Sequence, residues 1–108
     1  MTKTLSPITP GDVLLEEFLK PMNITQTQLS KDIKVPANRV SQVIHGKREI
    51  TADTALRLGK YFNMEPEFWL NLQVRYNMKI ARSKIGKKIE KEVRVYFPKA
   101  EMHDHVNA

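Results

Sequence analysis

The chain has 108 residues, enough for one domain with a modest core and a short extension. It contains no cysteine, which excludes a disulfide scaffold and a thiolate zinc finger, and no apolar run approaches the ~20 residues that cross a bilayer. The net charge of +6 favours a polyanionic partner whose binding weakens with salt.

The first predicted helix begins at Pro10 and ends before Pro21. Thr9 suits the N-cap, Pro10 fits the first turn, and Asp12 lies near the positive end of the helix dipole. The apolar positions of this segment predict a buried face formed by Val13, Leu14, Leu15 and Phe18.

A second helix is predicted from a start signal at Thr25. Thr25 followed three residues later by Gln28 fits a capping box, in which the two side chains satisfy backbone donors at the helix start. Leu29 and Ile33, four residues apart, then supply the buried stripe.

A break and a third helix follow. Pro36 disfavours helical geometry in the residue before it but suits the first turn of a new helix. We therefore expect the break at residues 34–35 and the next helix over about 36–45. Gly46 would end it in the left-handed conformation.

The third predicted helix has an apolar face and an amide-rich face. At about 100° per residue, the apolar side chains that point one way are Val40, Val43 and Ile44. The polar side chains that cluster opposite are Asn38, Gln42 and His45, flanked by Arg39 and Ser41. A basic segment with Lys47 and Arg48 follows.

This polar face has two interpretations. Asn, Gln and Arg are common on any solvated helix, and alone they indicate little. A cap, a short turn, a second helix and a basic exit within residues 25–48, which carry a net charge of +4, together favour a helix-turn-helix that presents this face to DNA. Asn or Gln can bond adenine bidentately and Arg suits guanine.

Two further helices complete the predicted fold. Thr51 with Asp53 begins one, whose predicted core residues are Ala55, Leu56, Leu58 and Phe62. Pro66 begins the last, on which helical spacing relates Phe68 or Trp69, Leu72, Tyr76 and Ile80. The fold class is therefore all-α, a compact five-helix helix-turn-helix domain over residues 10–82, with an arm at 1–9 and a basic extension at 83–108.

Trp69 allows two roles. As a core residue it would anchor the last helix against the first. As an interface residue it would join a homodimer contact made by Trp69, Leu72 and Tyr76, since aromatic residues are enriched at such contacts. A two-fold dimer would place its recognition helices in successive major grooves and require a palindromic operator in double-stranded DNA.

The extension is basic, with eight Lys or Arg against two Glu in residues 79–99. Residues 84–92 could prolong the last helix, although Gly86 weakens that prediction. Residues 93–97 alternate as a short strand would. A partly ordered tail, a strand added to a partner's sheet or exchanged within a dimer, and extra phosphate contacts all fit this segment.

Catalysis finds little support, and we predict no enzyme, no cofactor and no metal site. The four glycines are scattered and form no phosphate loop. His103 and His105 are two candidate ligands in a terminal tail, which is too few for a site. Residues 1–10 lack the apolar segment of a secretion signal, so we expect a soluble cytoplasmic, nucleoid-associated protein without a membrane partner.

The residues also resemble a known family. Segments 26–29, 35–41 and 44–48 are similar to the phage-repressor (XRE) type of helix-turn-helix, and segments 10–19, 50–58 and 67–73 narrow the resemblance to HigA-type antitoxins. The resemblance implies a dimeric repressor of its own toxin-antitoxin operon that binds a small HigB-like ribonuclease toxin. An orphan XRE regulator without a toxin, or a module that mainly binds protein, is the alternative.

Under the DNA-binding interpretation each polar side chain has a predicted role. The base contacts are Ala37, which would meet a thymine methyl, Asn38, Arg39 and Gln42. The phosphate contacts are Gln26, Lys47 and Arg48, and Gln26 is placed by the resemblance alone.

One residue departs from the family pattern. Many members carry Gly at the position of Lys34, where the turn between the two helices usually has a positive φ. We therefore expect a strained, left-handed Lys34.

Overall fold

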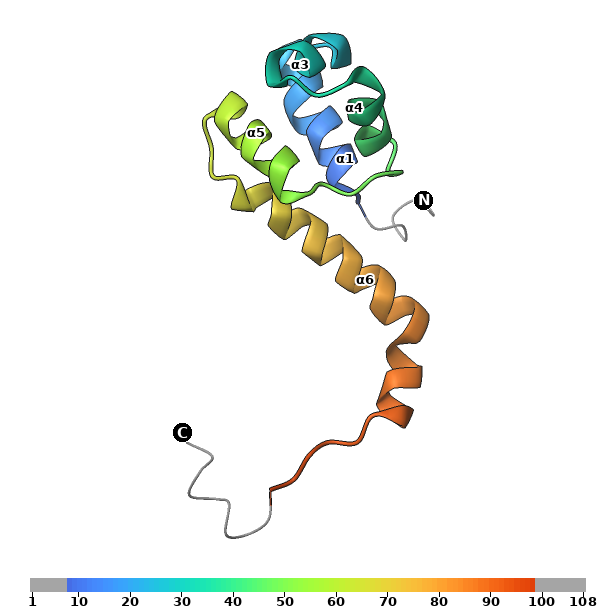
Figure 1. The fold of residues 1–108 in the computed structure, drawn as a ribbon. Coiled ribbons are helices and arrows are strands. Elements are labelled where there is room, and N and C mark those ends of the chain that lie inside the picture. Colours follow the sequence, from blue (N-terminus) through green and yellow to red (C-terminus); the bar gives the residue numbers. More distant parts are fainter. Residues whose placement is uncertain (1–7, 99–108) are drawn as a thin grey trace.

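A computed structural model describes residues 8–98 of the chain. Its helices are α1 (Pro10–Val13), η2 (Leu14–Leu19), α2 (Lys20–Met22), α3 (Gln26–Ile33), α4 (Ala37–Ile44), α5 (Ala52–Phe62) and α6 (Glu67–Glu92). Since α1, η2 and α2 are continuous, the predicted five-helix, all-α fold is confirmed. Figure 1 shows a bundle of the shorter helices, from which α6 projects.

The first helix runs past Pro21, and the prediction that it ends before this residue was wrong. Thr9 and Asp12 form a complete capping box at its start. The middle of the helix, η2, has π-type turns in which the Lys20 N–H donates to the Leu15 carbonyl. Such wide turns relieve the clash that a proline ring makes with the preceding turn. The helix ends at Asn23 in the left-handed region (φ 60°).

The two helices of the predicted motif begin and end close to their expected positions. Thr25 caps α3 by accepting from the Gln28 N–H at 3.0 Å. The second half of the predicted capping box was wrong, because the Gln28 amide instead donates to Asp32 at 2.8 Å. Pro36 precedes α4 as its N-cap, and Gly46 follows it with φ +75°.

A single apolar core holds the bundle together. It comprises Val13, Leu14, Leu19, Leu29, Ile33, Val35, Val40, Val43, Ile44, Ile50, Ala55, Leu58 and Trp69. Leu56, which we expected in the core, is 62% exposed. The inward face of α5 instead follows Thr54, Ala55, Leu58 and Gly59, and one residue step, about 100°, turns Leu56 away from Ala55.

An aromatic cluster joins the last helix to the first. Trp69 is fully buried, and its ring centroid lies 4.9 Å from that of Phe18 and 5.0 Å from that of Phe68. Phe62 also lies 4.9 Å from Phe18. The prediction of Trp69 as the core anchor of the last helix is therefore confirmed.

Past Gln73 the described chain has no buried residue. The helix continues through Gly86 to Glu92, as the prolongation of the last helix required. The alternating residues 93–97 form no strand, and there is no strand elsewhere in residues 8–98. A strand needs a pairing partner, and alternation in one chain does not supply one.

Lys34 adopts the left-handed conformation that the sequence predicted, with φ 60° and ψ 46°. We expect Lys34→Gly to relieve ~1 kcal/mol of backbone strain and to raise the melting temperature by about 4–8 °C in a domain of this size. Thermal unfolding followed by circular dichroism measures the change. Lys34→Ala is the control, because it removes the same side chain but keeps Cβ; an equal gain from Ala would mean that the lysine side chain, and not the backbone, is unfavourable.

Candidate nucleic-acid interface

The predicted base-reading residues lie on the outer side of α4. Ala37 and Asn38 are exposed in its first turn, while Arg39 and Gln42 are half-buried. The opposite side of the same helix is anchored in the core through Val40, Val43 and Ile44, each at most 5% exposed. One short helix therefore joins an apolar inner face to an outer face of amides and one guanidinium. The assignment of these side chains to bases stays a prediction.

The C-terminal end of α4 lies against the backbone of the first helix at Gly11. A Cβ atom added to Gly11 would lie 2.1 Å from the Val43 carbonyl oxygen and 2.7 Å from that of Ile44. These atoms belong to the backbone, so no rotamer change could make room. Glycine at this position is required for the observed approach of the two helices.

Gln42 and Arg48 form one polar unit. The Arg48 Nε donates to the Gln42 Oε1 at 3.0 Å across the turn that follows α4. A predicted base reader and a predicted phosphate contact are thereby joined, and neighbouring Lys47 is exposed. A bonded Arg48 holds the Gln42 amide in one orientation, with its NH₂ group directed away from the guanidinium.

His45 turns back on its own helix, although we expected it on the polar face. Its Nδ1 lies 2.8 Å from the Ser41 carbonyl oxygen and 3.3 Å from the Ser41 hydroxyl. This contact covers part of the helix C-terminus, where carbonyls lack partners within the helix. The side chain remains exposed.

Gln26 is the first residue of α3 and is half-buried. The N-terminal turn of a helix presents backbone N–H groups and the positive end of the dipole, which favour an anion. This position is compatible with the phosphate contact that the family resemblance implies.

Polar contacts from α5 and α6 hold the segments on either side of α4. Tyr61 on α5 donates its hydroxyl to the Asp32 carboxylate at 2.6 Å. This bond, with a second from Gln28, lowers the pKa of Asp32, and the same contact raises the pKa of Tyr61. On α6, the buried Gln73 accepts from the Ile50 N–H at 2.9 Å and so holds the segment that follows α4.

Sequence reasoning missed three of these residues. Gln73, Arg57 and Gly11 lie in the segments that carry the family resemblance, but far along the chain from the segments that they contact, so capping and helical periodicity assigned them no role. Arg57 donates to the carbonyl of Ile33, 24 residues away. Only knowledge of the packed bundle reveals such pairs.

Other kinds of site are not found in residues 8–98. No group of three His, Cys, Asp or Glu side chains is placed to hold a metal ion, and no helix there has the length and apolar character needed to cross a membrane. His103 and His105 lie outside the described residues.

Comparison with known proteins identifies the class. A family model described as Helix-turn-helix matches residues 15–69, slightly more than half of the chain. Virulence-associated protein I of Dichelobacter nodosus is 45% identical over 74 residues, which are 68% of either chain. This chain therefore belongs to the helix-turn-helix family of DNA-binding proteins and is not an enzyme.

Solved structures narrow the class to the HigA antitoxins. An addiction module antidote protein of the HigA family from Coxiella burnetii is 53% identical with a TM-score of 0.80, covering 84% of this chain and 99% of that one. Pseudomonas aeruginosa antitoxin HigA, solved with the higBA promoter, is 40% identical with a TM-score of 0.81 over the same shares. Antitoxin HigA-1 of Vibrio cholerae is 42% identical over 67 residues, 62% of this chain and 63% of that protein. The chain is of the HigA type within the XRE group of helix-turn-helix proteins.

Proposed function

We propose that this chain represses its own toxin-antitoxin operon by binding a palindromic operator as a homodimer, and that it neutralises a HigB-like toxin by direct binding. The observation that carries the DNA-binding part is the outer face of α4, where Asn38, Arg39 and Gln42 lie opposite a buried apolar face. Structures of similar antitoxins with a promoter or operator support it. Such a protein acts at the nucleoid in the cytoplasm.

In this proposal Ala37, Asn38, Arg39 and Gln42 meet base edges, while Gln26, Lys47 and Arg48 meet phosphates. Fluorescence anisotropy with the chain's own promoter and with a scrambled duplex, at two salt concentrations, tests it. We expect a preference for the promoter of ~10³ or more. Equal, salt-sensitive binding to both duplexes would mean that the protein binds DNA by charge alone, without sequence specificity. It would favour the protein-binding alternative.

Gln42→Ala tests the recognition face itself. The loss of one bidentate base contact should reduce discrimination at a single operator position by about 1–3 kcal/mol, without changing the salt dependence. Lys47→Met is the contrasting variant: it should weaken binding to all duplexes alike and reduce the slope of log K against log salt by about 0.9. An unchanged operator preference in Gln42→Ala would contradict the assignment of α4 as the reading helix.

The exposure of the side chains on α6 supports a proposal for the contact with a second copy. Trp69 is enclosed by its own chain and has no surface to offer, and Leu72 and Tyr76 lie half-buried on the same side. At about 100° per residue, the opposite side carries an exposed stripe of Val74, Met78, Ala81, Ile85 and Ile89. Four of its members line a hollow of about 510 Å³.

We propose this stripe as the dimer contact in place of the residues predicted from sequence. A two-fold axis brings the same stripe of both copies together. A monomer normally exposes apolar residues singly, whereas these five form a continuous row along the helix. The double variant Met78→Glu/Ile85→Glu should be a monomer in analytical ultracentrifugation. Ser83 is exposed on the other side of α6, so the control variant Ser83→Glu should remain a dimer. If Tyr76→Glu dissociates the dimer and the stripe variants do not, the contact is the one predicted from sequence.

The toxin-binding part rests on the similarity to HigA antitoxins and on the segments outside the bundle. Co-expression with the product of a small neighbouring reading frame tests it, with growth as the readout. We expect the full chain to restore growth and a chain that stops after Glu92 to keep operator binding but lose protection, if the basic tail is the contact. A chain that lacks residues 1–7 tests the N-terminal arm in the same way. Failure of the full chain to protect would favour the orphan regulator.

A further inference from the structure

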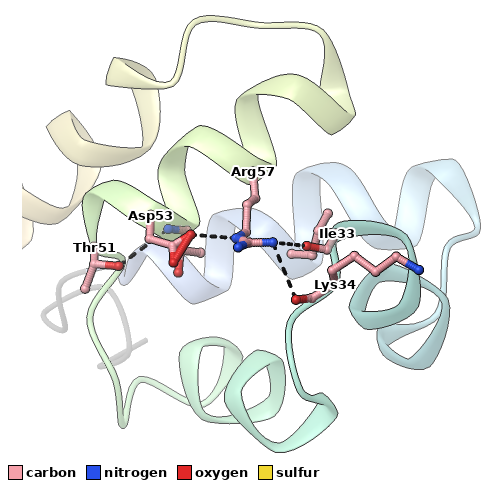
Figure 2. A network of polar contacts seen from close by, with 6 residues as sticks. Ile33, Lys34, Thr51, Asp53 and Arg57 are labelled. Atoms are coloured by element: carbon pink, nitrogen blue, oxygen red, sulfur yellow. Dashed lines mark hydrogen bonds and ion pairs between the residues drawn. The ribbon is translucent and has the colours of Figure 1, made fainter.

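Arg57 of α5 reaches the turn between α3 and α4. Its Nη1 donates to the carbonyl oxygen of Ile33 at 2.8 Å and lies 3.5 Å from that of Lys34. Its Nε donates to the Asp53 carboxylate one turn earlier on α5 at 2.5 Å. Figure 2 shows the guanidinium between the carboxylate on one side and the two carbonyls on the other.

The two carbonyls need an external donor. They end α3, where the last four carbonyls have no partner within the helix. The nearest N–H groups, those of Lys34 and Val35, both donate to the carbonyl of Ser30. They therefore do not bond the carbonyls of Ile33 and Lys34. A cation at this end also complements the negative end of the helix dipole, so Arg57 closes α3 in both respects.

The contact point is close to the recognition helix. Lys34 is in the left-handed region, and only Val35 and Pro36 separate it from the first residue of α4, Ala37. In the element pairs with substantial contacts, α4 packs on α1 and α3, and α5 packs on α3 and α6. Side chains of α5 and α4 also share the apolar core, through Leu58 and Val40, but the bonds from Arg57 are the polar contacts of α5 with the turn that leads into α4.

We propose that Arg57, oriented by Asp53, is a positioning residue for DNA binding, which fixes the turn that aims α4 without itself touching DNA. The proposal rests on the proposed operator binding. The side chains of Arg57 and Asp53 are 40% and 56% exposed, and exposed ion pairs contribute little to global stability. Variants of this pair should therefore fold, and the effect to be measured is on the direction of α4.

The first arm of the test needs no DNA. Amide hydrogen exchange of Arg57→Met is compared with that of the unmodified protein on both sides of the turn. The amides before it are those of Lys34 and Val35, which donate to Ser30. The amides after it are those of Arg39 and Val40, which donate to Pro36. We expect these four to exchange faster. The Leu29 amide, bonded to Thr25 at the far end of α3, should be unchanged. Unchanged exchange at the turn overturns the proposal whatever the DNA data show.

The second arm measures affinity and its salt dependence on the promoter duplex, well below the melting temperature. Without Arg57 the turn has to be ordered when DNA binds, and an ordering cost equal to one hydrogen bond from a charged donor should weaken binding about tenfold. The salt slope should stay that of the unmodified protein, because no phosphate contact is removed. A slope reduced by about 0.9 would show a direct phosphate contact, and unchanged affinity would show that the turn does not aim α4; either result overturns the proposal.

Two variants separate position from charge. Lys60→Met removes one positive charge from α5 at a residue that lines the same surface hollow as Arg57, and it should leave affinity nearly unchanged. Asp53→Asn keeps the Arg57 charge but removes the ion pair that orients it, and it should weaken binding in the same direction as Arg57→Met. If Lys60→Met weakens binding as much as Arg57→Met, the effect is one of charge and the proposal is wrong.

A failure of the proposed function is recognised separately. If the unmodified protein does not prefer its promoter over a scrambled duplex, operator recognition fails. The exchange arm still decides whether Arg57 holds the turn, and the affinity arm then uses whichever duplex is bound.

Discussion

The close approach of the first helix to α4 at Gly11 is the contact on which the geometry of the site depends. Eight residues form a helix that is marginal on its own, so its direction has to come from its neighbours. The backbone at Gly11 touches the last turn of α4 with no side chain between them, while Val40, Val43 and Ile44 fix the rotation of the helix about its axis. Together these contacts leave the amide face outward.

The remaining contacts act at the flanks of this helix. The left-handed Lys34 turns the chain from α3 into α4, and Arg57 bonds the carbonyls at that turn. Behind α4, the buried Gln73 holds the Ile50 amide. A binding surface held in this way loses less conformational entropy when it meets its ligand. Buried apolar residues supply most of the stability, whereas partly exposed polar contacts set direction.

Local features of the sequence were sufficient to predict much of this arrangement. The strained turn at Lys34 was indicated by the family resemblance, through the glycine that many members carry there. Thr25 marked the start of α3, and Pro36 and Gly46 bounded α4, by local signals alone. These signals depend on a few neighbouring residues, which act the same way in many folds. Pro21 and Leu56 were misjudged because their outcome depends on a π-type turn and on which face of α5 meets the core. Gly11, Arg57 and Gln73 could not be found, since each contacts a segment far along the chain.

The length of α6 gives this small domain two separate surfaces. In its first two turns the helix contributes Trp69 and Gln73 to the interior, and through the bond to Ile50 it supports the side that we propose for DNA binding. Beyond Asn77 it leaves the bundle, and its apolar stripe faces away from the side that packs. One continuous helix therefore carries both the apolar stripe and the residue that holds the segment after α4. Because Gln73 and Val74 are adjacent and about 100° apart around the helix, a single helical step separates the residue that holds Ile50 from the first residue of the stripe.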